Sequence, residues 1–141
     1  MSKTFLYLFF RIGKVPPALM AKFQADGIVF FDEGIRGTVT YKNYRGPGRY
    51  SNWKRQWFSS TIVLTNKGLI AYRLRQRIID VPLDDPKLKQ MRFAVENGDK
   101  LLAAFDAELF QPGWSGTIEY RFSTPFAQAI YDRLMPHTLP S

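Results

Sequence analysis

The stretch Tyr41–Trp57, YKNYRGPGRYSNWKRQW, decides how the rest of the chain can fold. At its centre Gly46-Pro47-Gly48 favours a loop, because proline lacks an N–H and the glycines are flexible. On one side, the segment 37–44 alternates in the two-residue period of a strand. On the other side, the segment 53–64 contains a β-branched run that favours an extended chain. We therefore expect a basic, aromatic loop that joins two strands.

This stretch is also the candidate binding site, because it contains five cations, five aromatic residues and no acid. The candidates for contact with an anionic ligand are Lys42, Arg45, Arg49, Lys54 and Arg55, and the candidates for stacking or docking are Tyr44, Tyr50 and Trp53. Trp53, Arg55 and Trp57 share one strand face, which can stack on nucleobases. Tryptophans at such positions more often fill a core, so we expect Trp57 to be buried and leave Trp53 open.

The segments on both sides of this stretch predict a single domain, residues 1–141, with a mainly β (α+β) fold. A proline-started segment that ends at Gly27 predicts a short N-terminal helix, so residues 1–27 form an extension and a helix. Residues 28–122 predict about seven to eight antiparallel strands in a small, partly open barrel, with an acidic turn after the first strand and the hairpin turn Asn97-Gly98. Residues 124–135 predict a capping helix. It would begin at Thr124, end before Pro136 and bury Phe126, Ile130 and Leu134.

The composition argues against catalysis. The chain has no cysteine and one histidine, His137, so thiolate and histidine metal sites are excluded and no cofactor is expected. The best pair of acids is Asp106 and Glu108, with Glu119 near them if both lie on one strand face. Without a nucleophile and base, or a glycine-rich phosphate loop, we expect no catalytic residue and a protein that is not an enzyme.

Charge and hydropathy bear on partners and location. Residues 1–79 contain 14 Lys and Arg against three acids, whereas residues 80–141 contain six against nine, so the fold should have a basic side that favours anionic partners. The apolar run Phe5–Phe10 is too short to span a bilayer and no signal cleavage site follows it. We expect this run to pack on the barrel or in a homo-oligomer contact. The expected location is the cytoplasm or, peripherally, the inner face of the membrane.

Short motifs add a resemblance to a known family. Trp53–Phe58, WKRQWF, follows Gly37-Thr38-Val39 and precedes Leu69–Tyr72. This order resembles the start of pleckstrin-homology domains, which run G-x-L, a basic loop, W-K-x-R-W-F and then L-x-Y. The stretches Val63–Tyr72 and Asp80–Leu83 also resemble a strand pair of bacterial PH-like and GRAM-like domains. The resemblance covers residues 28–135 and implies a seven-stranded, partly open barrel with a C-terminal helix.

The same resemblance implies a non-catalytic module that targets membranes or docks proteins. Two positions depart from the phosphoinositide-binding pattern. The second basic residue of W-K-x-R is Gln56 here and the cation stands at Arg55, on the other strand face, while the lysine expected after the leading glycine is displaced from Tyr41 to Lys42. The expected partners are therefore an anionic membrane surface or an acidic protein, and nucleic acid is the alternative for the same surface.

Overall fold

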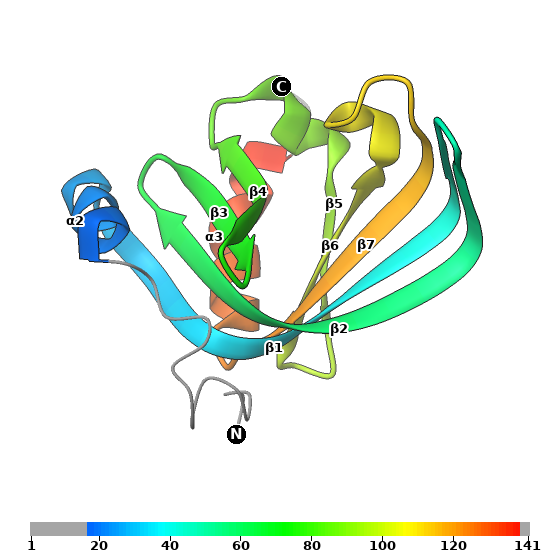
Figure 1. The fold of residues 1–141 in the computed structure, drawn as a ribbon. Coiled ribbons are helices and arrows are strands. Elements are labelled where there is room, and N and C mark those ends of the chain that lie inside the picture. Colours follow the sequence, from blue (N-terminus) through cyan, green and yellow to red (C-terminus); the bar gives the residue numbers. More distant parts are fainter. Residues whose placement is uncertain (1–16, 139–141) are drawn as a thin grey trace.

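The structure of the protein is a computed structural model, which describes residues 17–138. Figure 1 shows one long β-hairpin that curves under the remaining elements. In chain order the elements are α2 (Pro17–Asp26), β1 (Ile28–Gly46), β2 (Arg49–Thr65), β3 (Gly68–Arg73), β4 (Gln76–Pro82), the 3-10 helix η1 (Pro86–Gln90), β5 (Arg92–Glu96), β6 (Lys100–Asp106), the 3-10 helix η2 (Ala107–Leu109), β7 (Ser115–Ser123) and α3 (Ala127–Thr138).

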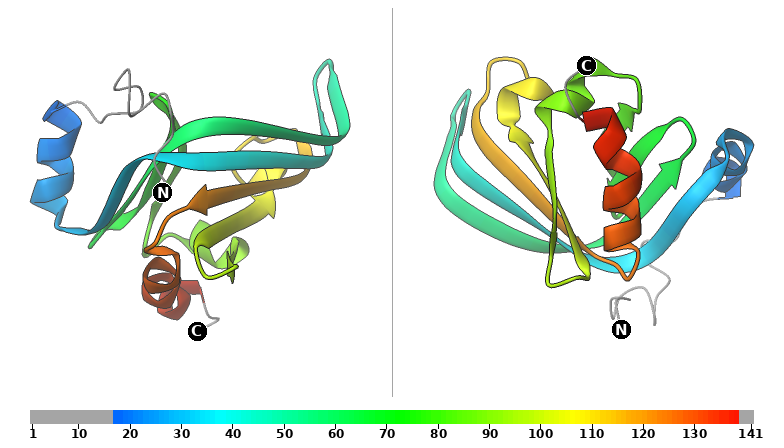
Figure 2. Two further views of the ribbon diagram at one scale, coloured as in Figure 1. Left: turned by 90° about the horizontal axis from the view of Figure 1, so that it is seen from below. Right: turned by 180° about the vertical axis from the view of Figure 1, so that it is seen from behind.

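The strands form one antiparallel sheet in the order β4-β3-β2-β1-β7-β6-β5. The sheet is open, with β4 and β5 as its two ends. Helix α3 lies across the opening between these ends (Figure 2). The predicted mainly β fold, with its C-terminal helix and its short N-terminal helix, is confirmed.

The main core lies on the inner face of the curved sheet, between the strands and α3. Its fully buried members include Val39 of β1, Ile62 of β2 and Phe122 of β7, all at most 1% exposed. From α3, Ile130 and Leu134 complete it. Alternation along each strand explains which strand residues are buried in this core, because every second side chain points to this face. Each such side chain contributes about 1.5–3 kcal/mol through burial.

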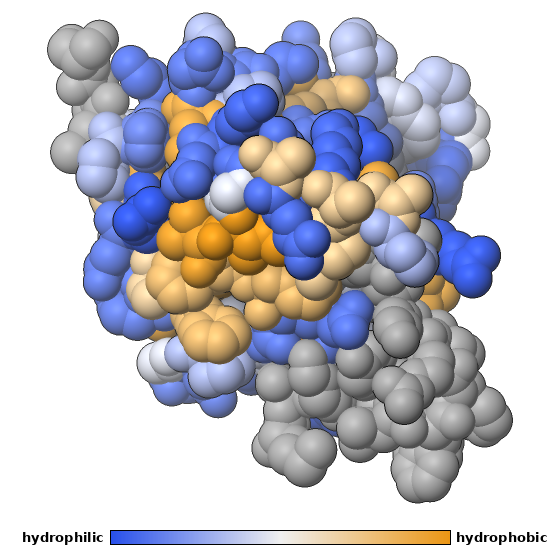
Figure 3. Space-filling view, turned by 90° about the vertical axis from the view of Figure 1, so that its left-hand side faces the viewer, coloured by the Kyte–Doolittle hydropathy of each residue, from blue (hydrophilic) through white to orange (hydrophobic). Residues whose placement is uncertain are grey.

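A smaller apolar cluster lies on the outer face, under α2. Phe23 of the helix packs on Val63 and Tyr72, with a Phe23–Tyr72 ring distance of 6.4 Å. Half-buried Phe31 and Ile70 adjoin this cluster. Figure 3, which views the molecule from the side of α2, shows an apolar area bordered by hydrophilic side chains. The helix therefore covers one end of the outer face, through Phe23 and the partly buried Leu19.

The predicted acidic turn after the first strand is wrong. β1 runs through Asp32, Glu33 and Gly34 without a break and is one strand of 19 residues. Gly34 has a φ of 69° and lies at a bulge where the pairing with β2 shifts by one residue. Glycine suits this bulge, because a residue without a Cβ adopts the positive φ found here without strain. The sheet accordingly has seven strands, the lower of the two predicted numbers.

The C-terminal helix differs from the prediction at both ends. The predicted cap, Thr124, lies three residues before the helix, and the Phe126 N–H donates to the Thr124 Oγ1 at 3.2 Å in the turn that precedes it. Phe126 lies in the turn before the helix and is 39% exposed, so its predicted burial is wrong and Ala127 takes the buried position. Pro136 does not end the helix, which continues to Thr138. A proline so close to the end removes only one backbone donor there.

Candidate ligand-binding face of the first hairpin

The predicted basic loop is mostly strand. β1 and β2 pair in one register from Arg36 opposite Ser59 to Gly46 opposite Arg49, with a local irregularity at Asn43, whose φ is 50°. Only Pro47 and Gly48 form the turn, and Gly48 has a φ of 69°. Proline followed by a residue with positive φ is typical of a type II turn, which makes the reversal tight. The basic and aromatic side chains therefore occupy fixed positions on two paired strands.

The outer face of this hairpin contains the two exposed tryptophans. Thr38 lies opposite Trp57, Thr40 opposite Arg55 and Lys42 opposite Trp53, so all six side chains share one face. Trp57 is 63% exposed and Trp53 is 58% exposed. The predicted burial of Trp57 is therefore wrong. Its neighbour Phe58 points to the inner face and fills the core, and within residues 17–138 no helix covers the outer face at this point.

Arginines lie over both tryptophan rings. The Arg36 guanidinium is 5.3 Å from the Trp57 ring centroid, and the Arg55 guanidinium is 5.3 Å from that of Trp53. The Arg55 Nε also donates to the Thr40 Oγ1 at 2.9 Å. Such contacts hold the cation and the ring together at the surface. We call Arg36, Trp57, Arg55, Trp53 and Lys42 the outer-face ladder.

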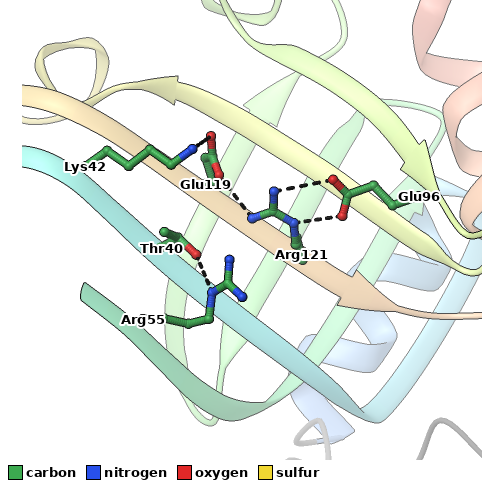
Figure 4. Close-up of polar contacts among 6 residues, drawn as sticks. All are labelled: Thr40, Lys42, Arg55, Glu96, Glu119 and Arg121. Atoms are coloured by element: carbon green, nitrogen blue, oxygen red, sulfur yellow. Dashed lines mark hydrogen bonds and ion pairs between the residues drawn. The ribbon is translucent and has the colours of Figure 1, made fainter. Parts of the chain in front are cut away.

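Acids of β5 and β7 border this ladder (Figure 4). The Lys42 Nζ donates to the Glu119 Oε2 at 3.0 Å, and the Arg121 Nη1 donates to the Glu119 Oε1 at 3.1 Å. Glu96 binds Arg121 through both oxygens. Burial alone raises the pKa of Glu119, but the hydrogen bonds from Lys42 and Arg121 outweigh it and the pKa is lowered. The hydrogen bond to Glu96 raises the pKa of Arg121.

The five predicted cations are all exposed, but they do not share one face. Lys42 and Arg55 belong to the outer-face ladder, whereas Lys54 lies opposite Tyr41 on the inner face. Arg45 and Arg49 are at the turn end of the hairpin. Cations thus surround the end of the hairpin on both of its faces.

The predicted stacking residues have different environments. Tyr50 is 56% exposed and lies under the Arg45 guanidinium at 4.8 Å, so it remains a candidate, as does Trp53. Tyr44 is only 6% exposed. Its ring stacks on Trp114 at 4.8 Å and its Oη donates to the Gln111 Oε1 at 3.0 Å. Tyr44 is therefore part of the protein interior and cannot stack on a ligand.

Arg36 was not among the predicted site residues, and the acids that border the ladder were not placed beside it. The signal for Arg36 was present, since Arg36, Thr38, Thr40 and Lys42 follow a period of two. The continuous β1 strand puts them on one face, and the predicted turn before residue 37 hid that relation. Glu119 and Arg121 lie far away in sequence, so only the pairing of β1 with β7 brings them to Lys42.

The predicted acid pair does not form on one strand face. Asp106 ends β6, whereas Glu108 lies in the 3-10 helix η2, and Glu119 is engaged by Lys42 and Arg121. In the part of the chain from 17 to 138, no group of three His, Cys, Asp or Glu side chains is placed to hold a metal ion.

None of the helices within the described range is long and apolar enough to cross a bilayer. The apolar run Phe5–Phe10 lies outside the described residues, so its predicted packing stays a prediction. Comparisons of the chain with models of protein families, with curated proteins and with solved structures found no significant match.

Proposed function

We propose that the protein is a non-catalytic binding module that attaches to an anionic membrane surface through the outer-face ladder and the end of the β1–β2 hairpin. The observation that carries the proposal is the exposure of Trp53 and Trp57 on both sides of Arg55. Tryptophan is enriched where membranes meet water, because its ring is apolar and its indole N–H is polar. Arginine binds phosphate groups through its planar fork of donors.

The magnitudes show why both residue types are needed. Near an anionic membrane each cation contributes about 1 kcal/mol, so the three cations of the ladder supply only about 3 kcal/mol. That energy corresponds to an affinity weaker than about 1 mM. A second signal is required for attachment, and two exposed indole rings beside the cations supply apolar area of the right kind. The PH-like resemblance implies the same role.

Vesicle sedimentation tests this proposal. We expect wild type to bind vesicles rich in anionic lipid, more strongly at low salt than at physiological salt, and to ignore neutral vesicles. Trp53→Ala/Trp57→Ala should remove most binding at physiological salt. Arg36→Glu/Arg55→Glu should remove it at both salt concentrations.

The matched control is Lys89→Glu/Arg92→Glu, which makes the same charge change at exposed positions outside the hairpin. This variant should bind anionic vesicles better than Arg36→Glu/Arg55→Glu does. Equal loss in both charge variants would show that only net charge matters. Equal binding by wild type and the double tryptophan variant would show that the ladder is ordinary solvated surface.

One observation favours a second candidate, single-stranded nucleic acid. Trp53 and Trp57 are four residues apart on an extended strand, about 13 Å at the usual rise, and Arg55 stands between them. Two bases stacked on these rings would gain about 1–3 kcal/mol each, with Arg55 at the phosphate between them. Filter binding of a short single-stranded oligonucleotide to the same variants distinguishes the candidates. Oligonucleotide binding without vesicle binding would replace the membrane proposal.

A further inference from the structure

One edge of β2 has no neighbouring strand among the described residues. β3 pairs with β2 only between Ser60 and Leu64. The last backbone bond on this side is from the Leu74 N–H to the Ser59 carbonyl, at 2.9 Å. From Arg49 to Phe58, β2 continues beyond the end of β3, which is visible in Figure 1.

The hydrogen-bond pattern identifies the backbone groups along this edge. In an antiparallel sheet, alternate residues direct both their N–H and their C=O to the same side. The Ser59 carbonyl points towards β3, and the pairing with β1 has no bulge from Ser59 to Arg49. The N–H and C=O of Trp57, Arg55 and Trp53 therefore point towards the free edge. Those of Phe58, Gln56 and Lys54 point towards β1.

This edge differs from the two ends of the sheet. β4 has a bulge in its pairing with β3 and ends at Pro82, while β5 has five residues and contacts α3. Bulges, prolines and short strands are the usual protection of an edge. The free part of β2 has ten residues, no proline and a regular register. It is protected only by its cations.

The positive charge of these side chains also indicates which kind of strand can bind to the free edge. Arg49, Lys54 and Arg55 follow the edge, and the stretch 41–57 contains no acid. A second copy of this chain that paired through β2 would place like charges against one another, which destabilises a strand pair. We propose that the free edge of β2 binds an extended acidic segment of a partner protein, which adds to the sheet as an antiparallel strand.

The side chains of β2 predict the pattern of that segment. The positions opposite Trp57 and Trp53 would be apolar, because aromatic residues pair well with aromatic and β-branched ones across strands. The positions opposite Arg55 and Lys54 would be acidic and would lie on opposite faces of the sheet. The segment would therefore read apolar, any residue, acidic, acidic, apolar, from the position opposite Trp57 to the one opposite Trp53. This interaction goes beyond the proposed membrane attachment and needs no lipid.

A synthetic peptide tests the pairing without any change to the protein. The probe is the nine-residue peptide Thr-Val-Thr-Glu-Glu-Val-Thr-Val-Thr, whose segment Val-Thr-Glu-Glu-Val matches the predicted pattern. Its binding is measured by fluorescence anisotropy without vesicles. N-methylation of the residues whose N–H faces β2 should weaken binding about tenfold, since each methyl group removes a backbone hydrogen bond. N-methylation of the intervening residues should change binding less than about threefold.

Two variants at one position provide the second measurement. Arg55→Ala removes the charge and keeps the N–H that points towards the free edge, whereas Arg55→Pro removes both. A proline is tolerated at this position because its missing N–H would point away from β1. We expect Arg55→Pro to bind the peptide at least fivefold more weakly than Arg55→Ala, at equal melting temperature. If Arg55→Pro unfolds, the methylated peptides alone decide.

Equal effects of both methylation patterns, or no binding at all, would overturn the strand-addition proposal. In either case vesicle binding by wild type would leave the proposed function intact. Peptide binding that follows the methylation pattern, in a protein that does not bind anionic vesicles, would support strand addition and overturn the proposed membrane attachment.

Discussion

The two halves of the first hairpin are built from the same two strands but differ in what surrounds them. In the half near α2, residues 28–37 and 58–65, the inner face packs on the core, β3 pairs with β2, and α2 covers part of the outer face. In the half near the turn, residues 38–46 and 49–57, the inner face still packs on core aromatics. Within the described residues no helix covers its outer face and no strand pairs with this edge of β2. The difference shows that position in the sheet, and not strand composition, decides which side chains a partner can reach.

Two consecutive residues at the border of the halves give the largest test. Phe58 is 9% exposed and packs on Tyr120, whereas Trp57 is 63% exposed. We expect Phe58→Ala to lower the free energy of unfolding by about 3–5 kcal/mol, and Trp57→Ala to change it by less than about 0.5 kcal/mol. Urea denaturation measures both. Similar losses in the two variants would show that Trp57 is buried in solution.

The next test concerns the contact between β1 and α3. The Thr124 Oγ1 donates to the buried Asp32 Oδ2 at 2.8 Å and accepts from the Phe126 N–H. Thr124→Ala removes both bonds, so we expect a loss of about 1–2 kcal/mol in the free energy of unfolding. Thr124→Ser keeps the hydroxyl and should retain most of the stability. A loss in Thr124→Ser as large as in Thr124→Ala would assign the effect to the methyl group.

A smaller effect distinguishes two threonines of the outer face. Thr38 is 7% exposed and its Oγ1 has no hydrogen-bond partner within the described residues, whereas the Thr40 Oγ1 accepts from Arg55. Thr38→Val should raise the free energy of unfolding by about 1 kcal/mol, because it removes an unsatisfied buried hydroxyl at nearly the same volume. Thr40→Val should lower it slightly. Thermal melts of both variants check the order, which a stabilised Thr40→Val would contradict.

The smallest predicted effect is a pH dependence at the border of the outer-face ladder. The pKa of Glu119 is lowered from its usual 4.5 by the hydrogen bonds from Lys42 and Arg121, which outweigh burial. A lowered pKa in the folded state contributes stability above pH 4.5, and this contribution is lost as the pH falls through the lowered value. Glu119→Gln should therefore cost up to about 1 kcal/mol at pH 6 and less at pH 3.

The same variant bears on the proposed function, because it frees Lys42 from its partner. We expect Glu119→Gln to bind anionic vesicles more strongly than wild type at pH 7. A constant difference in stability across the pH range would show that Glu119 is not the titrating group. Weaker vesicle binding would place Lys42 outside the binding surface.

Much of the fold could be predicted because its signals are local. Asn97 and Gly98 both have positive φ in the turn between β5 and β6, as the residue pair indicates. The errors arose where tertiary context outweighs a local signal. Gly34 signals a turn as well as a bulge, and only the pairing of β1 along its whole length chooses the bulge. Phe126 fits an apolar helical stripe, yet the helix begins one residue later, at Ala127, and the Phe126 side chain is partly exposed to solvent.

The sequence by itself determined which side chains share a face in the regular stretches 36–42 and 53–58, since that depends only on the period of two along a strand. At Asn43, which has a φ of 50°, the alternation breaks and Tyr44 joins Tyr41 in the core. It also determined two cations of the outer-face ladder, Lys42 and Arg55, and the turn at Pro47-Gly48, whereas Arg36 was missed. Only the tertiary structure decided which face is covered, because α2 reaches the outer face at one end of the hairpin alone. The length of β3 decided that, among residues 17–138, no strand pairs with this edge of β2 from Arg49 to Phe58. A face is buried only when another element lies on it, and no pattern within the strand specifies where that element ends.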